Sequence, residues 1–520
     1  MTSQDKRRQD EDAPSRTYDY DPPSNWKDRP VIVTWTCALV CRQWRQLLLH
    51  SPSLWGRLID LDAFSVMDPL WKDDIMHRTA DSPLFVKGSA FVRWPREKEF
   101  FLSIIRDYWP RVEGFRMRIS GGMLLESNTW DFLFRPAPSL RQMHLHSRDG
   151  FDSSLFHSDM HLFNDHAPLL ESFASWRLGV FFHPKRNEWL RALQRMPCLE
   201  SLCLLKALPN PPDTSTSTPI QLPRLCKVDL NGGLRACTVF LAQIIPPTDC
   251  HLFIDTFDED EPLTSADLSL ATKVLTRYSR KFLDSLVRTS LAFALYDLGF
   301  RIADKAPRRD VQKELTFYVD ISSPASTGLF SLLQGPSSCN FKTIKTLELQ
   351  TDASSFGGGW DKDVVDFLRT LEGVELILAD MSALRTLGDE DNDYSNIFPN
   401  LREIKVTKSM GYEDVFSYSH ELLPFLESRR SLGAPIEVLD FSLWTGLEDV
   451  GRFNGIEGLK VIYCDEEGVT IREHYCRPNA TAPPDSQDDR TEELSVELPR
   501  KDNARTRSLA PGSLGRKKST

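Results

Sequence analysis

The feature that most constrains the fold is a six-residue pattern, apolar-x-x-apolar-x-apolar, which recurs at nearly even intervals along the chain. In the first half, successive copies start 28, 30, 29 and 26 residues apart, at Val112, Leu140, Leu170, Leu199 and Leu225. Each of these copies has a proline two residues earlier, and only the third, which ends in serine, departs from the full form. The pattern resumes at intervals of 27, 30, 35 and 23 residues, at Ile344, Leu371, Leu401, Ile436 and Leu459.

Each copy has the length and the alternation of a short β-strand. Because side chains alternate between the two faces of a strand, the last two apolar positions share one face, and the first anchors the turn before the strand. About twenty residues then return the chain, and RNEWLRALQRMP (186–197) has the apolar spacing of a helix in one such return. Each unit buries its apolar face only against its neighbours, so the pattern predicts a curved α/β stack.

The pattern and its interval resemble those of leucine-rich repeats, whose period is roughly 20 to 29 residues. The copies are less regular than a consensus array, and the asparagine that closes a consensus repeat is generally absent. The resemblance implies an α/β leucine-rich-repeat solenoid over 80–255 and 316–470 that captures a protein on its concave strand face. Alternation predicts the outward positions on that face to include Gln142, His144, Ser201, Cys203, Lys227, Asp229, Thr346, Glu348, Glu403 and Lys405. The predicted substrate-binding set is His144, Ser201, Lys227, Asp229, Thr346 and Glu403.

A stretch of different character separates the two runs. Cys250, Leu252 and Ile254 predict one more strand, after which DTFDEDEP (255–262) leads into apolar residues at helical spacing over 265–298. We therefore predict a helical insertion over 256–315, with the sheet resuming at Leu315, Phe317 and Val319. Two interpretations remain open: a long helical return within the stack, or a helical cover that shapes a binding site for a partner.

A short amphipathic helix precedes the repeats. From Thr34 to Leu49, the apolar residues recur at spacings of three and four, namely Cys37, Val40, Cys41, Trp44, Leu47 and Leu48. They form one stripe of a helix, with arginines and glutamines on its other side. Ser51-Pro52 ends that helix, and Pro52 can begin a second helical turn that carries Leu54 and Trp55.

The segment VCRQWRQLLLHSPSLWGRLIDL (40–61) resembles the second half of an F-box of the fungal type. The resemblance implies an F-box-like segment over 31–62 that docks on a Skp-type adaptor and, through it, on a cullin. The residues that it assigns to adaptor binding or to the core of the box are Val40, Cys41, Trp44, Leu47, Leu54 and Trp55, and we expect Trp44 to be structural. Where the family has Leu-Pro and an amphipathic helix, this chain has RTYDYDPPSNWKDRPVIV. Either the first half is missing from the gene model, or the box is degenerate.

Composition excludes several other classes of protein. The net charge of −11 disfavours a general nucleic-acid-binding protein. The longest apolar runs fall short of the roughly 20 residues that cross a bilayer, and the first residues have no apolar stretch of a signal peptide. We therefore expect a soluble protein of the cytoplasm, the nucleus or both. Its 10 cysteines include no CxxC pair, and we expect most of them to be reduced. Few large apolar residues lie in 1–30 and 477–520, which we expect to be disordered.

The search for chemistry yields little that is specific. Five histidines lie within 23 residues, and His157 and His161 share a helical spacing, but the stretch has no HExxH motif and no cysteine partner. We predict no metal site, no cofactor and no catalytic residue. The sequence thus predicts the substrate-recognition subunit of a Skp-cullin-F-box ubiquitin ligase that binds an unknown protein. The alternative is a leucine-rich-repeat scaffold that has lost adaptor binding.

Overall fold

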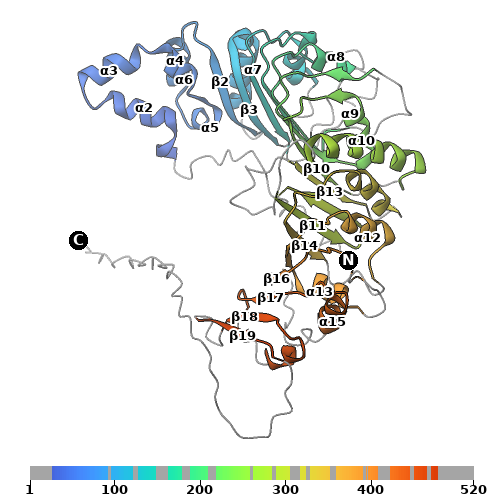
Figure 1. Cartoon of the computed structure of the whole chain (residues 1–520). Helices are drawn as coiled ribbons and strands as arrows, with labels where there is room; N and C mark the ends of the chain where they lie inside the picture. Colours follow the sequence, from blue (N-terminus) through green and yellow to red (C-terminus); the bar gives the residue numbers. More distant parts are fainter. Residues whose placement is uncertain are drawn as a thin grey trace, which may run out of the picture.

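Strands laid side by side form the framework of the molecule (Figure 1). The computed structural model describes residues 26–477 apart from 92–94, 121–126, 148–161, 178–187, 209–217, 258–261, 284–288, 305–316, 324–327, 352–358, 390–393, 395, 408–421, 445–449 and 465–469. Within the described residues the fold is mixed α/β, with a 17-stranded sheet and a second sheet of β7 (Ile220–Gln221) and β9 (Ile244–Ile245).

The order of strands in the large sheet follows the chain over most of its length. From the first edge, it contains β1 (Ile59–Asp60), β2 (Leu84–Phe91), β3 (Val112–Ser120), β4 (Gln142–Ser147), β5 (Ser172–Trp176), β6 (Ser201–Leu205), β8 (Lys227–Gly232) and β10 (His251–Thr256). It continues with β13 (Phe317–Ser322), β12 (Gly299–Ala303), β11 (Ser290–Tyr296), β14 (Thr346–Thr351), β15 (Leu376–Ala379), β16 (Glu403–Val406), β17 (Val438–Phe441), β18 (Lys460–Cys464) and β19 (Ile471–Tyr475). Only the pairs β13–β12, β12–β11 and β18–β19 are antiparallel among these described strands.

The helices connect the strands and begin with a helical group at the N-terminal end. That group comprises the 3-10 helix η1 (Trp26–Asp28) and helices α2 (Pro30–Ala38), α3 (Arg42–Leu49), α4 (Pro52–Gly56), α5 (Leu61–Phe64) and α6 (Pro69–Arg78). The later α-helices are α7 (Pro95–Tyr108), α8 (Glu188–Gln194), α9 (Leu234–Ala242), α10 (Ser265–Leu283), α11 (Gln334–Ser337), α12 (Lys362–Arg369), α13 (Met381–Leu387) and α15 (Leu423–Ser431). Further 3-10 helices are η2 (Trp109–Arg111), η4 (Ser127–Phe134), η6 (Leu162–Asp165), η9 (Leu329–Leu333) and η11 (Val450–Gly455).

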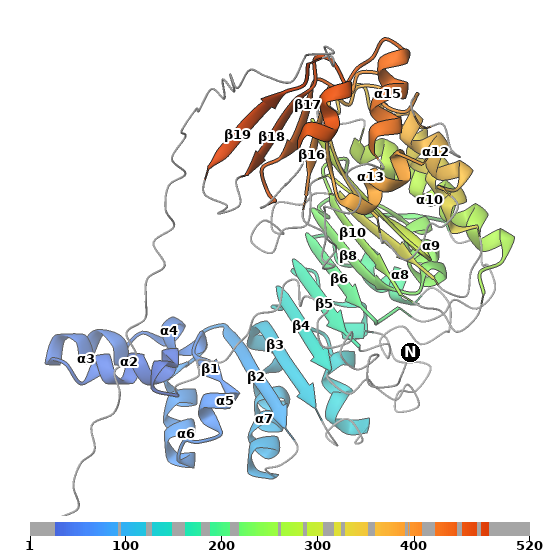
Figure 2. The same ribbon diagram turned by 90° about the horizontal axis from the view of Figure 1, so that it is seen from below.

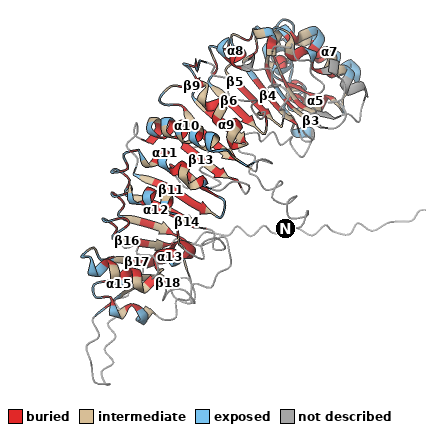
Figure 3. Ribbon diagram, turned by 90° about the vertical axis from the view of Figure 1, so that its right-hand side faces the viewer, coloured by how far each residue is buried: buried red, intermediate tan, exposed pale blue. Residues whose placement is uncertain are grey.

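The sheet curves into an arc with its later helices on the outer side (Figure 2). One continuous cluster of buried apolar side chains runs between the two layers, from Val31 on α2 to Cys476 after β19. Figure 3 shows the same distribution, with buried residues concentrated in the strands and exposed ones on the outer surfaces of the helices. The predicted units therefore share a single interior. Within the described residues, no helix combines the length and the apolar character that crossing a membrane requires.

All ten copies of the sequence pattern lead into a strand of the sheet, and eight have the predicted register. The turns before the strands stack through backbone hydrogen bonds. For example, the Arg141 N–H donates to the Glu113 carbonyl oxygen at 2.8 Å, and the Glu171 N–H donates to the Arg141 carbonyl oxygen at 2.8 Å. The next two apolar positions, such as Met143 and Leu145 on β4, are buried. The helix predicted within 186–197 is also confirmed, as α8.

Two copies have a different register from the predicted one. The copy assigned to Leu371 begins three residues later, because Leu347 on β14 pairs with Ile377, which places Leu376 on the opposite face from the core. Apolar residues at three-residue intervals made both alignments compatible with the pattern. In the copy assigned to Leu459, Val461 pairs with Leu439, so Ile462 also lies opposite the core. A shift by one residue moves every side chain to the other face of the strand.

The predicted helical insertion over 256–315 is wrong in its second part. Helix α10 ends at Leu283 rather than continuing to Leu298, and the hairpin β11–β12 then joins the sheet between β13 and β14. The stretch Leu291–Leu295 is buried on both faces, so its apolar residues are continuous, and short runs of this kind do not distinguish helix from strand. The predicted strands at Leu252 and Phe317 are confirmed as β10 and β13, and Leu315 lies outside the described residues.

The expected disorder of the termini falls largely on residues that the structure does not describe. The structure describes part of the N-terminal stretch over 1–30 that we expected to be disordered. In that part, residues 26–28 form η1 and α2 begins at Pro30, so the predicted disorder extends too far along the chain. Residues 478–520 lie outside the described part. The prediction of a disordered tail therefore stays a prediction.

Candidate functional site

The first candidate surface is the helical segment α2–α4, which extends away from the sheet (Figures 1 and 2). Trp55 on α4 anchors it, since this side chain is fully buried and its Nε1–H donates to the Leu48 carbonyl oxygen at 2.8 Å. Trp35 on α2 packs against the Trp55 ring at 6.2 Å and against the Trp71 ring at 4.7 Å, measured between ring centroids. The segment is thus attached to the rest of the molecule through tryptophans.

Helix α3, whose residues are all described, buries none of them. Four residues that the sequence assigned to the segment face solvent: Val40 is 69% exposed, Leu47 is 67% exposed, Trp44 is 53% exposed, and Cys41 is also exposed. Leu54 is half-buried against the core, and Trp55 belongs to the core. The six predicted residues therefore divide into an exposed apolar group on α3 and the turn before it, and a packed group on α4.

The single helix predicted over Thr34–Leu49 is wrong, because the chain breaks between α2 and α3. Cys41 takes an extended conformation with φ −153° and ψ 165°, and its Sγ accepts a hydrogen bond from the Trp44 N–H at 3.4 Å. Helix α3 consequently starts anew at Arg42, and Leu49 at its C-terminal end packs against the core. Because Trp44 is exposed, the expectation that it is a structural core residue is wrong. The predicted turn at Pro52 is confirmed as α4.

The second candidate surface is the side of the large sheet opposite the core, which we call the open face. Strand pairing places one row of residues across it, in the order Lys87, Arg116, His144, Ala174, Cys203, Asp229, Phe253, Tyr318, Ala303, Ala292, Glu348, Leu378, Lys405, Asp440 and Ile462. The open face lines the inner side of the arc (Figure 2).

All six residues predicted for substrate binding lie on the open face. His144 and Asp229 belong to this row, while Ser201, Lys227, Thr346 and Glu403 lie two residues before it on their strands. Neighbouring strands are about 4.8 Å apart, and ten such spacings separate β4 from β16, or roughly 50 Å along the sheet. The structure therefore does not bring the six together in one small site. Whether they bind a protein stays a prediction.

From β8 onward, several charged residues of the open face have partners within the chain. The Lys227 Nζ lies 3.6 Å from a carboxylate oxygen of Asp229, and the Lys405 Nζ lies 2.6 Å from one of Asp440. Arg301 lies 3.9 Å from an Asp320 carboxylate oxygen. Hydrogen bonding to Lys405 and Ser442 outweighs burial and lowers the pKa of Asp440. On these strands, part of the charge of the open face is therefore already paired.

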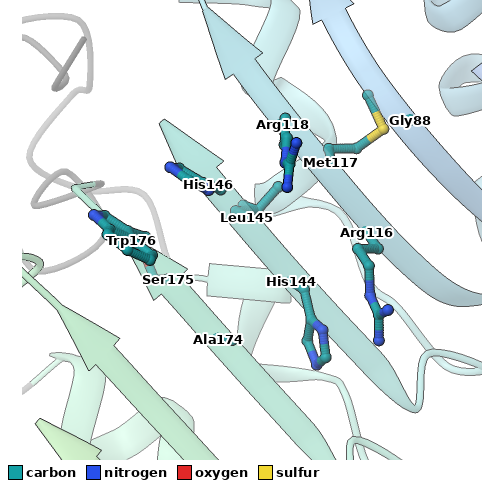
Figure 4. Close-up of a pocket in the computed structure, with 10 residues that line it drawn as sticks. All are labelled: Gly88, Arg116, Met117, Arg118, His144, Leu145, His146, Ala174, Ser175 and Trp176. Atoms are coloured by element: carbon teal, nitrogen blue, oxygen red, sulfur yellow. The ribbon is translucent and has the colours of Figure 1, made fainter. Parts of the chain in front are cut away.

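The strands β3–β5 have a different composition, with a pocket between their side chains (Figure 4). We call its polar and aromatic lining the Arg-His patch, defined by Arg116, Arg118, His144, His146 and Trp176. Burial, together with a smaller effect of the nearby arginine charges, lowers the pKa of His144 and of His146 to about 4, so both imidazoles are neutral at pH 7. The rings of His146 and Trp176 stack at 4.6 Å between centroids, with 3° between their planes.

The sequence prediction found only His144 of the five residues in this patch as a binding residue. The available signal was the alternation in RVEGFRMRI (111–119), which assigns Phe115 and Met117 to the core and therefore Arg116 and Arg118 to the other face. Within the described residues, no group of three or more potential ligands is placed to hold a metal ion. His157 and His161 lie outside those residues.

Comparison with known proteins adds no assignment. A scan of the chain against protein-family models finds no match, and a search of curated proteins finds no significant similarity. The function is therefore argued from the two surfaces: an exposed apolar group on a protruding helix, and an open sheet face with a cationic and aromatic end.

Proposed function

We propose that this protein is the substrate-recognition subunit of a Skp-cullin-F-box ubiquitin ligase. In this proposal the helical segment α2–α4 docks on the Skp-type adaptor, and a leucine-rich-repeat solenoid formed by the large sheet binds the protein to be modified. The observation that carries the proposal is the exposure of Trp44 and Leu47 on α3, a helix that buries none of its own residues, and of Val40 in the turn before it. Large apolar side chains gathered on a protruding surface are typical of protein interfaces.

The packing of the segment supports a role in docking rather than in folding. Trp55 and the tryptophans around it already provide the contacts that attach the segment to the sheet. Leu49 at the end of α3 packs against the core, whereas Trp44 and Leu47 are exposed, and no packing within the described residues compensates for their exposure. An adaptor that covers them removes this apolar surface from water, which is a favourable contribution of about 25 cal/mol per Å².

The architecture supports the second half of the proposal. The strands repeat at the intervals of the sequence pattern and share one interior, as units of a solenoid do. The open face extends along the inner side of the arc (Figure 2), and repeat proteins commonly bind partners on an extended concave surface of this kind.

Co-purification of the full chain with a Skp adaptor and its cullin tests the proposal. We expect the wild-type chain to retain the adaptor, and the Leu47→Asp variant to retain at least about tenfold less, because a charge would be placed within an apolar interface. The matched control is Leu432→Asp, at an apolar position directly after α15 that is 53% exposed, which should bind the adaptor like the wild type. Circular dichroism of each variant checks that it is folded.

Failure of the wild-type chain to retain the adaptor at micromolar concentration would refute the ligase assignment. The open face would then support the alternative function, a leucine-rich-repeat scaffold without a ligase connection. Equal loss of adaptor in the Leu47 and Leu432 variants would show that α3 is not the docking surface.

A further inference from the structure

We propose that the Arg-His patch binds an extended acidic segment of the captured protein, with two carboxylates, two residues apart, lying against Arg116 and Arg118. This inference rests on the proposed function and specifies the chemistry of the substrate. It also places the binding of the captured protein on β3–β5, at the end of the sheet nearest the helical segment (Figure 2).

The spacing of the patch matches an extended peptide. Strand pairing places Arg116, His144 and Ala174 in one row, and Arg118, His146 and Trp176 in the next. The rows lie two residues apart on each strand, or roughly 7 Å. An extended peptide that runs along β3 repeats its own side chains at the same interval, so alternate carboxylates reach both guanidinium groups. Arginine forms charge-assisted, often bidentate hydrogen bonds with carboxylates.

The charges around the patch favour an acidic partner. Among the described strand residues of the open face, no carboxylate occurs from β2 through β6, and the first one is Asp229 on β8. Arg116 is exposed and forms no ion pair with any residue that the structure describes. Beyond β2, Asp60 lies 3.0 Å from Arg29 and 4.0 Å from Lys87. Asp62 lies 3.9 Å from Arg29 and accepts a hydrogen bond from the Ser89 N–H at 2.8 Å, next to Arg118 in the strand pairing. Arg116 therefore presents the exposed positive charge at this end of the open face.

The remaining residues of the patch shape the rest of the site. The small Ala174 lies between His144 and Cys203 in its row, and the pocket opens there beside the flat stack of His146 and Trp176. Figure 4 shows the arginines and histidines side by side along the two strands, with Trp176 next to them. An aromatic or apolar residue next to the acidic pair can pack on the indole ring.

Acidic protein is favoured over nucleic acid as the occupant. The patch is small, whereas the strands that follow along the open face contain Asp229, Asp255 and Asp320. Because Asp229 pairs with Lys227 and Asp320 pairs with Arg301, these strands offer no row of unpaired cations on which the phosphates of a longer nucleic acid strand could continue. The chain as a whole also has a net charge of −11, so no long-range field concentrates phosphate polymers at the patch.

Protonation of the imidazoles is linked to binding. The charged groups that face His144 and His146 are Arg116 and Arg118 from β3 and Arg177 after β5, with the hydroxyl of Ser172 at 3.0 Å from the His144 Nε2. All three charges are positive, and carboxylates that neutralise them raise the pKa of both imidazoles. Binding of an acidic peptide should therefore strengthen as the pH falls from 7.5 to 5.5.

Fluorescence anisotropy with the purified full chain tests the proposal. The probe is a fluorescein-labelled peptide that contains Glu-Ser-Glu between glycine and serine residues, and the comparison probe contains Gln-Ser-Gln. We expect only the acidic probe to bind, and Arg116→Glu to weaken its binding at least about tenfold, the factor that corresponds to one charge-assisted hydrogen bond. The matched control is Arg369→Glu on α12, whose partner is Asp366 on the same helix and which should leave binding unchanged.

Several outcomes would overturn the proposal. Equal binding of both probes, or equal loss in the Arg116 and Arg369 variants, would show that the patch does not recognise carboxylates. Displacement of the peptide by a short single-stranded RNA of higher affinity would identify nucleic acid as the occupant. Tighter peptide binding after neutralisation of the acidic residues in 485–497 would make that stretch of the same chain the occupant. Adaptor retention is measured separately, so peptide binding without adaptor refutes only the proposed function.

Discussion

Arg429 on α15 provides a direct test of how successive units are held together. Its guanidinium group is buried, with 1% of the residue exposed, and it donates hydrogen bonds to the carbonyl oxygens of Ile397 at 3.2 Å, Phe398 at 2.9 Å and Leu401 at 3.0 Å. These carbonyls belong to the turn before β16, where Phe398 has a positive φ of 59°. A non-glycine residue in that region costs about 1 kcal/mol or more, so the turn depends on its hydrogen bonds.

We expect Arg429→Met to lower the free energy of unfolding of this part of the chain by about 3–5 kcal/mol. The change leaves three buried carbonyl groups without their donor, at about 1–3 kcal/mol each, and the apolar methionine side chain offsets part of the loss. Burial also lowers the pKa of Arg429, which shows that desolvation opposes its charge, yet removal of one partner from a buried network is costly.

Urea unfolding measures the loss in the free energy of unfolding, and hydrogen exchange followed by mass spectrometry shows which part of the chain is affected. Amides of 396–407 and 423–432 should exchange faster in the Arg429→Met variant than in the wild type. The neighbouring Arg430→Met is the matched control, because Arg430 is exposed and pairs with Glu457 at 2.8 Å, an interaction worth less than about 1 kcal/mol. A loss below about 0.5 kcal/mol in both variants, with unchanged exchange, would refute the reasoning that this arginine joins the units.

Three further predictions follow from individual residues. Gly299→Ala should destabilise the chain by about 2 kcal/mol in thermal unfolding, because a Cβ there would lie 1.9 Å from a backbone oxygen of β13, whereas Gly455→Ala, in open space, should change little. Stability should fall as the pH drops from about 6.5 to 4, since His144 binds a proton in the unfolded chain but not in the folded one, and His144→Gln should reduce this dependence by about 2 kcal/mol. Trp55→Ala should cost about 3–5 kcal/mol in urea unfolding, and Trp44→Ala less than about 1 kcal/mol. Equal effects within either matched pair, or a flat pH profile, would contradict these expectations.

The sequence predicts the sheet well because the burial of one face of each strand requires apolar residues at regular spacing along the chain. In copies such as Leu199–Leu204, only one alignment of the large apolar residues fits the pattern. The pattern therefore gives the position of the strand, its buried face and its register at once. The predicted register of a strand is wrong where more than one alignment of apolar residues fits the pattern. Leu371, Val374 and Ile377 are apolar at equal spacing, and only pairing with β14 decides among them. Long-range pairing is information that local spacing does not contain.

The hairpin β11–β12 and the break before α3 escape prediction for different reasons. In the hairpin, Ala292 and Ala303 pack with Phe253 and Tyr318 on the open face, so both faces are apolar and no alternation remains. Before α3, the stripe of apolar residues continues through Cys41, and only its extended backbone interrupts the helix. Of the candidate binding surfaces, Val40 and Leu47 were among the residues assigned to the F-box-like segment, Trp44 was expected to be structural, and the arginines of the Arg-His patch were not predicted.

The two proposed surfaces lie at the same end of the molecule, which has a mechanical consequence. Strand β1 follows α4 directly and pairs with β2, where Ile59 faces Val86, and Trp55 is buried in the same apolar cluster as the strands. The helical segment is therefore joined to β2–β5 by packed structure rather than by a flexible linker. If α3 docks on an adaptor and the Arg-His patch holds an acidic segment, the orientation of that segment relative to the adaptor is fixed by the fold. A rigid connection of this kind restricts which part of a captured protein can approach the rest of a ligase.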